Sequence, residues 1–329
     1  MIRRSPIQKL ASLAVALLCL GALPSASAQS AFPTKSIRIV VPFPPGGPTD
    51  IHARHYGNGL SKVLNQSVLI DNRAGAGGAI GTLEVKRSAP DGHTVLFTTA
   101  SSLVLYNLMA VKPQYDYLKD FVTIAAVGGS PVIIMAGKAA PQTLKALVDA
   151  ARAQPGKLTY GSPGQGTYLH LSMERFLYET GIKIEHIPFK GSAQVKPALL
   201  GGQVDTMIEA LSSGLSLHQA GQAKILAIAT AKRSPLAPDV PTVNEALGIK
   251  GFEAALWNGV AVPAGTPPAV VDVLAAATAK VLKDPVIADQ LTKLAVESMD
   301  TTPATATDYI RTEMAKWKPV VEATGLKIE

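Results

Sequence analysis

Cysteine is almost absent from this chain of 329 residues, with Cys19 as the only example. Because Cys19 lies in an N-terminal segment that we expect to be removed, the remaining chain contains no thiol. Disulfide bonds, thiolate catalysis and cysteine metal sites are therefore excluded from it. Without disulfides the fold depends on its hydrophobic core, and about 300 residues can build a large one, typically as two domains.

Motifs that bind nucleotides or metals are also missing. Residues 75–80 and 164–169 begin like G-x-G-x-x-G, but each ends on an aliphatic residue in place of the last glycine. No G-x-x-x-x-G-K-[ST] occurs. His52 and His55 share one helix face at i, i+3, but no H-E-x-x-H pattern accompanies them. We therefore expect no cofactor and no metal.

The first 28 residues have the composition of a secretion signal. Arg3, Arg4 and Lys9 form a basic start, residues 10–23 are apolar, and residues 26–28 (A-S-A) fit the small-x-small cleavage pattern. We predict cleavage before Gln29 and a periplasmic location. Residues 10–23 are too few to span a bilayer and no later apolar run reaches ~18 residues, so we expect no membrane insertion of the mature chain.

Charge and aromatic content are both modest. Removal of the three basic residues lowers the formal net charge from +7 to +4, which is 28 Lys and Arg against 24 Asp and Glu. There is no run of Lys or Arg, and aromatic residues make up 5% of the chain, so nucleic acid is not an expected partner. A mildly positive surface is compatible with small anionic ligands.

Short β-rich runs alternate with helical patterns, which predicts an α/β fold with parallel sheets covered on both faces by helices. One doubly wound sheet would need more strands than a domain usually carries. We predict strands at 36–41, 68–71, 94–99, 122–127, 132–136, 158–160, 183–187, 204–208, 225–229 and 255–262. We predict helices at 51–64, 79–87, 144–154, 167–180, 193–200, 213–220, 267–282, 285–294 and 303–323.

Two segments have the character of crossings between lobes. Residues 122–136 are two strand-like runs joined by G-G-S-P, and residues 229–241 are a Pro-rich, charged stretch that follows a strand. A chain that leaves one lobe, builds another and returns makes two hinge strands. We therefore predict a first lobe from residues 29–127 and 231–329, and a second lobe from residues 128–230.

Two glycine loops have the same design. Residues 40–50 run from an apolar strand through F-P-P-G-G into a helix that we expect Thr49 or Asp50 to open. Residues 158–171 repeat this order, with Thr167 as the expected cap. Glycine lets a ligand approach the backbone, and a helix start attracts anions. Two such units predict two lobes that grip a small anion, with ordinary βα turns as the alternative.

Ser162, in Y-G-S-P-G, is a near miss for the G-x-S-x-G nucleophile elbow because Tyr160 replaces the first glycine. His170 lies on the helix that follows, in a position that suits packing or capping better than deprotonation of Ser162. We therefore expect no catalytic residue, and an exported serine hydrolase that uses Ser162 is the alternative.

Taken together, these segments resemble the periplasmic solute receptors of tripartite tricarboxylate transporters, the Bug family, over essentially the whole mature chain. The resemblance rests, in order, on V-P-F-P-P-G-G-P-T-D, D-N-R-A-G-A-G-G, G-S-P-G-Q-G-T-Y-L-H-L, I-P-F-K-G, L-L-G-G-Q-V-D and A-V-P-A-G-T-P. It implies a type II periplasmic-binding-protein (Venus-flytrap) fold: two lobes of helix-flanked sheets, with two hinge strands, which close on a small carboxylate.

The resemblance also implies a set of ligand-binding residues. In the first lobe they are Phe43, Gly46, Gly47, Thr49, Asp50, Thr98, Thr99 and Ser101. In the second lobe they are Ser162, Gly164, Gln165, Gly166, Thr167, Lys190, Gly191 and Asp205. For Asp50 and Asp205 the alternative role is to brace a loop, and for Lys190 it is to face solvent.

As to function, the resemblance implies a monomeric, non-catalytic receptor that delivers its carboxylate to membrane permease subunits. A ligand sensor that feeds a signalling protein is an alternative within the same class. The effector domain of a transcription regulator shares the architecture, but the signal peptide and the missing helix-turn-helix argue against it.

Overall fold

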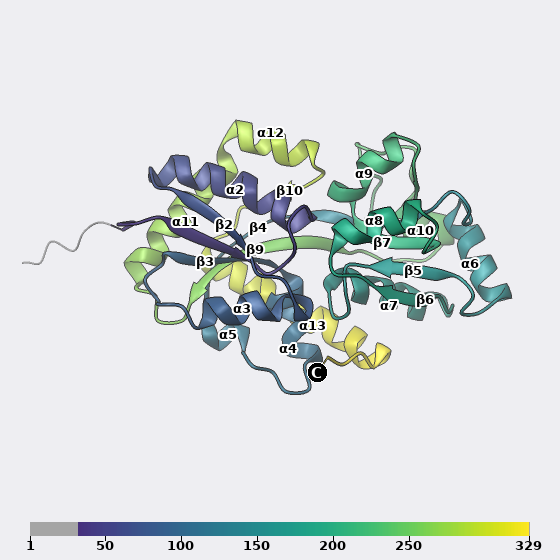
Figure 1. Cartoon of the computed structure of the whole chain (residues 1–329), viewed down its shortest axis with the longest axis horizontal. Helices are drawn as coiled ribbons and strands as arrows, with labels where there is room; N and C mark the ends of the chain where they lie inside the picture. Colours follow the sequence, from purple (N-terminus) through teal and green to yellow (C-terminus); the bar gives the residue numbers. More distant parts are fainter. Residues whose placement is uncertain (1–31, 329) are drawn as a thin grey trace, which may run out of the picture. The chain divides into compact units, whose positions relative to one another are not determined.

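The computed structural model describes residues 32–328 (Figure 1). The predicted signal peptide, with its cleavage site before Gln29, lies outside the described residues. The chain divides into the segment Met1–Thr34 and a compact unit, Lys35–Glu329. All of the described helices and strands belong to the second unit.

The first sheet has the strand order β2-β1-β3-β9-β4, with β10 paired to β4. β1 runs parallel to β2 and β3, but β9 is antiparallel to both of its neighbours, so the prediction of a purely parallel sheet is wrong. The strands are β1 (Ile37–Val41), β2 (Val68–Asn72), β3 (Thr94–Thr99), β4 (Phe121–Ala136), β9 (Ala255–Pro263) and β10 (Glu297–Ser298).

The second sheet continues from the far end of β4. Residues 132–136 of β4 pair antiparallel with β7 and β8, and β7 is followed by the parallel strands β5 and β6. These strands are β5 (Thr159–Ser162), β6 (Glu185–Pro188), β7 (Thr206–Ala210) and β8 (Lys224–Ile228). Because β4 belongs to both sheets, it connects the two lobes, which we name the first and second lobe after their sheets.

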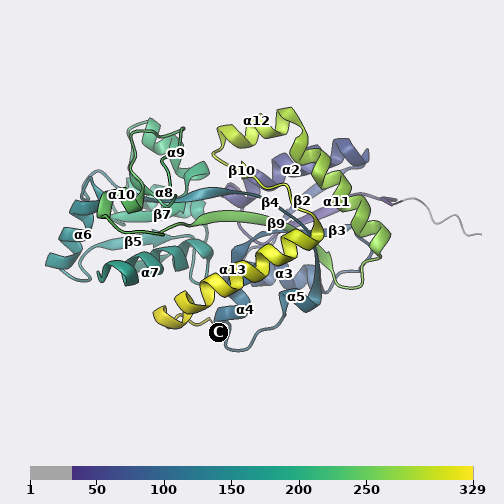
Figure 2. The same cartoon turned by 180° about the vertical axis from the view of Figure 1, so that it is seen from behind.

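Helices cover both faces of the first sheet, as Figures 1 and 2 show. On one face lie α2 (Pro48–Leu64), α11 (Pro268–Lys283) and α12 (Pro285–Lys293). On the other lie the short helices η1 (Ala76–Gly78), η2 (Ser101–Leu105), α4 (Tyr106–Met109) and α5 (Tyr117–Asp120), with α3 (Ala79–Lys86) and α13 (Pro303–Thr324). α13 also packs against α7 of the second lobe.

The second sheet is covered in the same way. α8 (Ser192–Leu200) and α9 (Leu211–Gln219) lie on one face, and α6 (Leu144–Ala153) and α7 (Tyr168–Thr180) lie on the other (Figure 1). α10 (Val243–Leu247) packs against α6 and β8 before the chain returns to the first sheet as β9. The division into lobes after residues 127 and 230 stays a prediction.

The strands predicted at 122–127 and 132–136 are one continuous strand, β4. The glycines between them do not form a turn. Glycine is needed there because the neighbouring strands lie too close to leave room for a Cβ. A Cβ on Gly128 would lie 2.5 Å from the Glu297 carbonyl oxygen, and a Cβ on Gly129 would lie 2.9 Å from the Trp257 Cα. The nine predicted helices are all present, with ends shifted by three residues or fewer.

Candidate ligand-binding site

The loop between β1 and α2 forms the first wall of the site. Gly47 is the N-cap of α2, and Pro48 occupies its first turn, where a missing N–H costs nothing. The prediction that Thr49 or Asp50 opens this helix is therefore wrong. Gly46 has a φ of 78°, in the left-handed region that favours glycine, and this turns the chain into the helix.

Asp50 holds this loop from behind. Its carboxylate accepts hydrogen bonds from the Gly46 N–H at 2.9 Å, from Arg54 Nε at 3.0 Å and from Asn72 Nδ2 at 3.0 Å. Burial acts to raise the pKa of Asp50, but these three hydrogen bonds outweigh burial and hold the pKa below its ordinary value. The side chain is only 3% exposed, and its polar contacts are directed into the loop.

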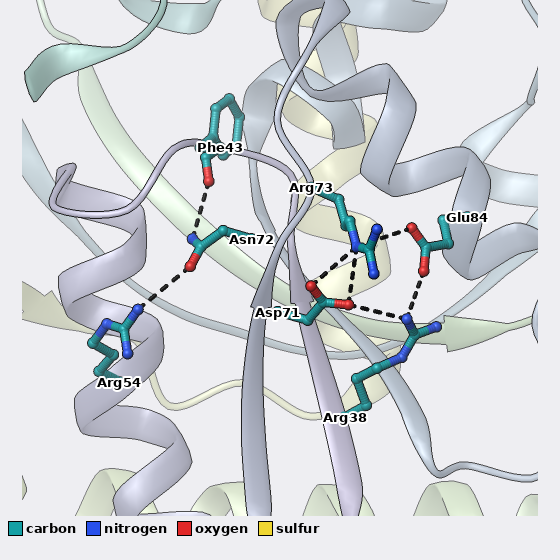
Figure 3. Close-up of polar contacts among 7 residues, drawn as sticks. All are labelled: Arg38, Phe43, Arg54, Asp71, Asn72, Arg73 and Glu84. Carbon is teal, nitrogen blue, oxygen red and sulfur yellow. Dashed lines mark hydrogen bonds and ion pairs between the residues drawn. The ribbon is translucent and has the colours of Figure 1, made fainter. Parts of the chain in front are cut away.

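Asn72 connects the loop to a frame of ion pairs. Its side chain also donates to the Phe43 carbonyl oxygen at 3.0 Å (Figure 3). Beside it, ion pairs join β1, β2 and α3 through Arg38, Asp71, Arg73 and Glu84. Each partly exposed pair contributes roughly 0–1 kcal/mol, so the frame mainly fixes the end of β2 that carries Asn72.

The start of α7 forms the second wall. Thr167 is its N-cap, as predicted: Oγ1 accepts from the His170 N–H at 3.3 Å and donates to the Gly164 carbonyl at 2.7 Å. At the neighbouring helix α8, Gly191 is the N-cap and Ser192 is the first helical residue.

Two amides of the second glycine loop are occupied within the loop. The Gly164 N–H donates to Ser162 Oγ at 3.2 Å, and the Gly166 N–H donates to His170 Nδ1 at 3.3 Å. Since Nδ1 accepts a hydrogen bond, the His170 ring carries its proton on Nε2. The structure therefore directs these two N–H groups toward side chains beneath the loop.

A stack of rings supports the loop from below. Ser162 Oγ lies 2.7 Å from His186 Nε2, and the His186 ring stacks on His170 at 4.1 Å and on Tyr160 at 4.8 Å. The Tyr160 hydroxyl donates to the Glu174 carboxylate. His186 had no role in the sequence prediction, because its contact with Ser162 depends on the register of β5 against β6.

The two stacked histidines are neutral at pH 7. Burial lowers the pKa of His186 to about 4. Burial, together with the neighbouring His186, lowers the pKa of His170 to about 3. A neutral His170 is what the loop requires, because an imidazolium has no lone pair to accept the Gly166 N–H.

A cavity of about 40 Å³ lies between the two walls. It draws on both lobes: the loop before α2 and the end of β3 on one side, the starts of α7 and α8 on the other. The lining residues are Phe43, Pro44, Gly47, Pro48, Thr49, Thr99, Ser101, Pro163, Thr167, Tyr168, Leu169, Gly191, Ser192 and Leu256.

Seven of the sixteen residues named as ligand-binding line this cavity: Phe43, Gly47, Thr49, Thr99, Ser101, Thr167 and Gly191. Seven others lie in or beside the two loops but do not line the cavity: Gly46, Asp50, Thr98, Ser162, Gly164, Gln165 and Gly166. The proline, leucine, Tyr168 and Ser192 positions of the lining were not predicted, since neither an apolar residue beside a glycine loop nor a single serine carries a distinctive signal.

Two further predicted residues lie elsewhere. Asp205 immediately precedes β7, and its carboxylate accepts from Thr159 N at 2.8 Å and from Thr159 Oγ1 at 3.0 Å. The Lys190 side chain is exposed, and its backbone N–H donates to Gln194. Both therefore match the alternatives of a brace and a solvent-facing residue.

The walls touch each other across the cleft. Ser101 Oγ, in η2, accepts a hydrogen bond from the Tyr168 N–H in the first turn of α7 at 2.9 Å. Gly191 packs so tightly on Pro44 that a Cβ there would lie 2.7 Å from the proline Cγ. The two walls are therefore in direct contact beside the cavity.

Helix starts, and no charged side chain, determine the electrostatic character of the cavity. Of the described residues that line it, none is charged. Three helices, α2, α7 and α8, begin at it, with Gly47, Thr167 and Gly191 as their N-caps. Helix starts supply N–H donors and a positive potential, so the site is suited to an anion such as a carboxylate.

His52 is buried and packed in the first lobe. Its Nδ1 lies 2.9 Å from Asn258 Oδ1, its ring packs edge-on against Phe97 at 5.2 Å, and burial lowers its pKa to about 4. His55 contacts Gln290 instead. Within residues 32–328 there is no cluster of three or more metal-ligating side chains.

Two α/β lobes that share strand β4 and enclose a cleft define a class, the type II periplasmic binding proteins of the Venus-flytrap kind. The chain belongs to one family of that class. The model of the family described as "Tripartite tricarboxylate transporter family receptor" matches residues 52–326. This confirms the family that the sequence resemblance indicated.

Individual relatives agree. BugT of Bordetella pertussis is 34% identical over 300 residues, which cover 91% of this chain and 92% of BugT. The solved structure of the periplasmic binding protein BugD is 30% identical and superimposes with a TM-score of 0.86, covering 91% of this chain and 100% of BugD. Rpa4515 of R. palustris, solved with adipate, is 33% identical and superimposes with a TM-score of 0.86. The match covers 90% of this chain and 99% of Rpa4515.

In residues 32–328, no helix has both the length and the apolar character required to cross a bilayer.

Proposed function

We propose that this protein is a monomeric, non-catalytic periplasmic receptor that binds a small organic carboxylate between its lobes. It delivers this ligand to the permease subunits of a tripartite tricarboxylate-type transporter. The observation that carries the proposal is the cavity at the starts of α2, α7 and α8, whose described lining residues include no charged side chain. Adipate in the related Rpa4515 supports a carboxylate ligand.

The proposed contacts follow from the geometry of the cavity. We expect the hydroxyls of Thr49 and Ser101 on one wall, and the Leu169 N–H on the other, to donate to the ligand, because these three residues line the cavity. The Thr99 hydroxyl already donates to Ser101. Hydrogen bonds to a carboxylate are charge-assisted and therefore stronger than neutral ones. Because only the closed state offers both walls at once, the ligand shifts an open–closed equilibrium toward closure.

Thermal unfolding with a panel of di-, tri- and aromatic carboxylates tests the binding. A ligand that binds only the native state adds ~2.7 kcal/mol at a hundredfold excess over Kd, which is easily seen as a rise in melting temperature. We expect at least one carboxylate to stabilise the protein, and its amide and ester to have no effect. Stabilisation by neutral sugars or metal ions alone would contradict the proposal.

Delivery to a permease is tested by uptake. Cells that lack this receptor should lose uptake of the radiolabelled ligand identified in the panel, and a plasmid copy of the receptor should restore it. Uptake that is unchanged, together with a ligand-dependent change in gene expression, would favour the sensor alternative.

One contact favours a second candidate, a serine hydrolase. Ser162 Oγ and His186 Nε2 are 2.7 Å apart, the spacing of a nucleophile and its base. However, Ser162 is 0% exposed and lies outside the cavity lining, so a substrate has no route to its oxygen. Incubation with a serine-directed fluorophosphonate should leave Ser162 unlabelled; labelling of Ser162 with ester turnover would support the hydrolase instead.

A further inference from the structure

The segment after α13 is attached to the first lobe. Gly325 caps α13 in the left-handed conformation, with a φ of 66°, and Ile328 then pairs in parallel with Ala110, the residue that follows α4. The Ile328 N–H donates to the Met109 carbonyl oxygen at 3.1 Å, and the Val111 N–H donates to the Ile328 carbonyl oxygen at 3.0 Å. Two backbone hydrogen bonds therefore fix Ile328 to the end of α4.

The side chain of Ile328 reaches the second glycine loop, which belongs to the other lobe. A Cβ on Gly166 would lie 2.9 Å from Ile328 Cγ2, so the isoleucine packs directly on this glycine. The helix η1 of the first lobe approaches the same loop. A Cβ on Gly77 would lie 3.4 Å from the Gln165 carbonyl oxygen and 3.5 Å from that of Gly166. The first lobe therefore holds this loop from two separate segments.

The contact of Ile328 lies next to the wall of the cavity. Gly166 is buried and directly precedes Thr167, which is the N-cap of α7 and lines the cavity. Leu169, in the first turn of the same helix, also lines it. A support on Gly166 therefore fixes the position of the helix start that faces the ligand, although Ile328 itself is outside the lining.

We infer that Ile328 is a positioning residue for ligand binding, which acts by holding the second glycine loop against the first lobe. Its backbone is tied to α4, so a separation of the lobes breaks its contact with Gly166 and leaves its two hydrogen bonds intact. The contact therefore stabilises only arrangements in which the walls face each other, and it slows the release of ligand. This inference rests on the proposed ligand-binding function.

The variant Ile328→Ala removes the side-chain contact and keeps both backbone hydrogen bonds. We expect Kd for the tightest-binding acid of the carboxylate panel to rise by about tenfold, mainly through faster dissociation. Ile328→Val keeps the Cγ2 methyl that faces Gly166, so its Kd should rise by less than about threefold. Lys327→Ala, at an exposed neighbouring position, is the matched control. Calorimetry measures Kd, and stopped-flow displacement measures the dissociation rate.

Melting temperatures without ligand distinguish this role from simple packing. Because Ile328 is only partly buried, we expect all three variants to fold. An Ile328→Ala protein that melts lower but keeps the Kd and dissociation rate of the original chain would show that Ile328 only packs, and would overturn the inference. An equal loss of affinity in Lys327→Ala would overturn it as well. If no acid of the panel binds the original chain, the proposed function fails, and the inference fails with it.

Discussion

Ser101 joins the two walls of the cleft by a hydrogen bond. It lies in the first lobe, yet it accepts the N–H of Tyr168 from the second lobe, and it is buried in the cavity lining. One hydroxyl therefore both joins the two lobes and offers its proton to the ligand. The neighbouring Ser102 is equally buried but bonds to Thr98 outside the lining, which makes it a matched control.

We predict that Ser101→Ala weakens ligand binding by about tenfold to a hundredfold, because a charge-assisted hydrogen bond and a contact between the lobes are both lost. Ser102→Ala should lower the melting temperature but leave Kd nearly unchanged. Calorimetry on both variants with the ligand from the carboxylate panel gives the comparison. Equal losses of affinity would show that Ser101 acts only through packing.

For single residues, the sequence predicted those features that depend only on neighbouring positions in the chain. Thr167 is the cap of α7 because a threonine between a glycine loop and an apolar helix is a cap signal wherever it occurs. The N-cap of α2 was predicted two or three residues too late, at Thr49 or Asp50. The helix begins earlier because Pro48 suits its first turn and Gly47 is the cap. His186 was missed because its partner Ser162 is 24 positions away in sequence.

Among the elements, the start of α2 depends most on buried charge. Asp50 fixes the Gly46 N–H, and Asn72 fixes the Phe43 carbonyl, so one side of the cavity is positioned by two side chains that are absent from its lining. Asp71, next in the chain, belongs to the partly exposed ion-pair frame of Figure 3.

We predict that Asp50→Asn lowers ligand affinity by about tenfold, because an amide in place of the buried carboxylate leaves one of its three donors unsatisfied and loosens the loop. Asp71→Asn should change Kd by less than about threefold, since exposed pairs contribute little. The measurement is Kd for both variants at neutral pH, with melting temperatures to confirm folding. An Asp50→Asn protein that binds normally would mean that the loop needs no brace.

Alternating hydrophobicity and helix-start signals sufficed to predict every long helix and most strands. The exceptions are β10, whose two residues are too few to show alternation, and β4, where two glycines imitate a turn. Glycine is required at those two positions because Glu297 and Trp257 lie too close for a side chain, and no local sequence pattern reveals those contacts. The short helices η2, α4, α5 and α10 were missed because segments of four or five residues have too few turns to show a period.

Across the whole molecule, three histidines with lowered pKa values, two of them buried and His186 partly exposed, make stability depend on pH. Burial lowers the pKa of His52 and of His186 to about 4 and that of His170 to about 3, from an ordinary value of 6.5. Below pH 6.5 the unfolded chain takes up protons that the folded chain does not. The stabilisation is therefore fully present above pH 6.5 and is lost as the pH falls toward 4.

We predict a steep decline of melting temperature between pH 6.5 and pH 4.5, without ligand. His52, which is 2% exposed, contributes on the order of 3 kcal/mol to the difference between pH 7 and pH 4. The partly exposed His186 contributes less. Calorimetric scans of the original chain and of His52→Gln measure this, and the variant should show a shallower slope. A melting temperature that is constant over this range would contradict neutral buried histidines.

The crossing segments at residues 122–136 and 229–241 indicated two lobes, but the sequence did not show how the lobes contact each other. Periodicity gives elements, but it does not say that β4 enters both sheets or that η2 meets α7. Such contacts join Ser101 to a partner 67 positions away and decide which loop residues line the cavity. For that reason seven of the sixteen expected site residues line it, while Asp50, Ser162 and Asp205 hold the loops and strands around it.

The most direct test of the central claim is a crystal structure of the protein with the tightest-binding acid of the carboxylate panel. The account predicts density for the carboxylate in the cavity between Ser101 and the first turn of α7, within hydrogen-bond distance of Ser101 Oγ and of the Leu169 N–H. Density at another site, or a ligand whose carboxylate is held by an arginine or lysine outside this cavity, would contradict it.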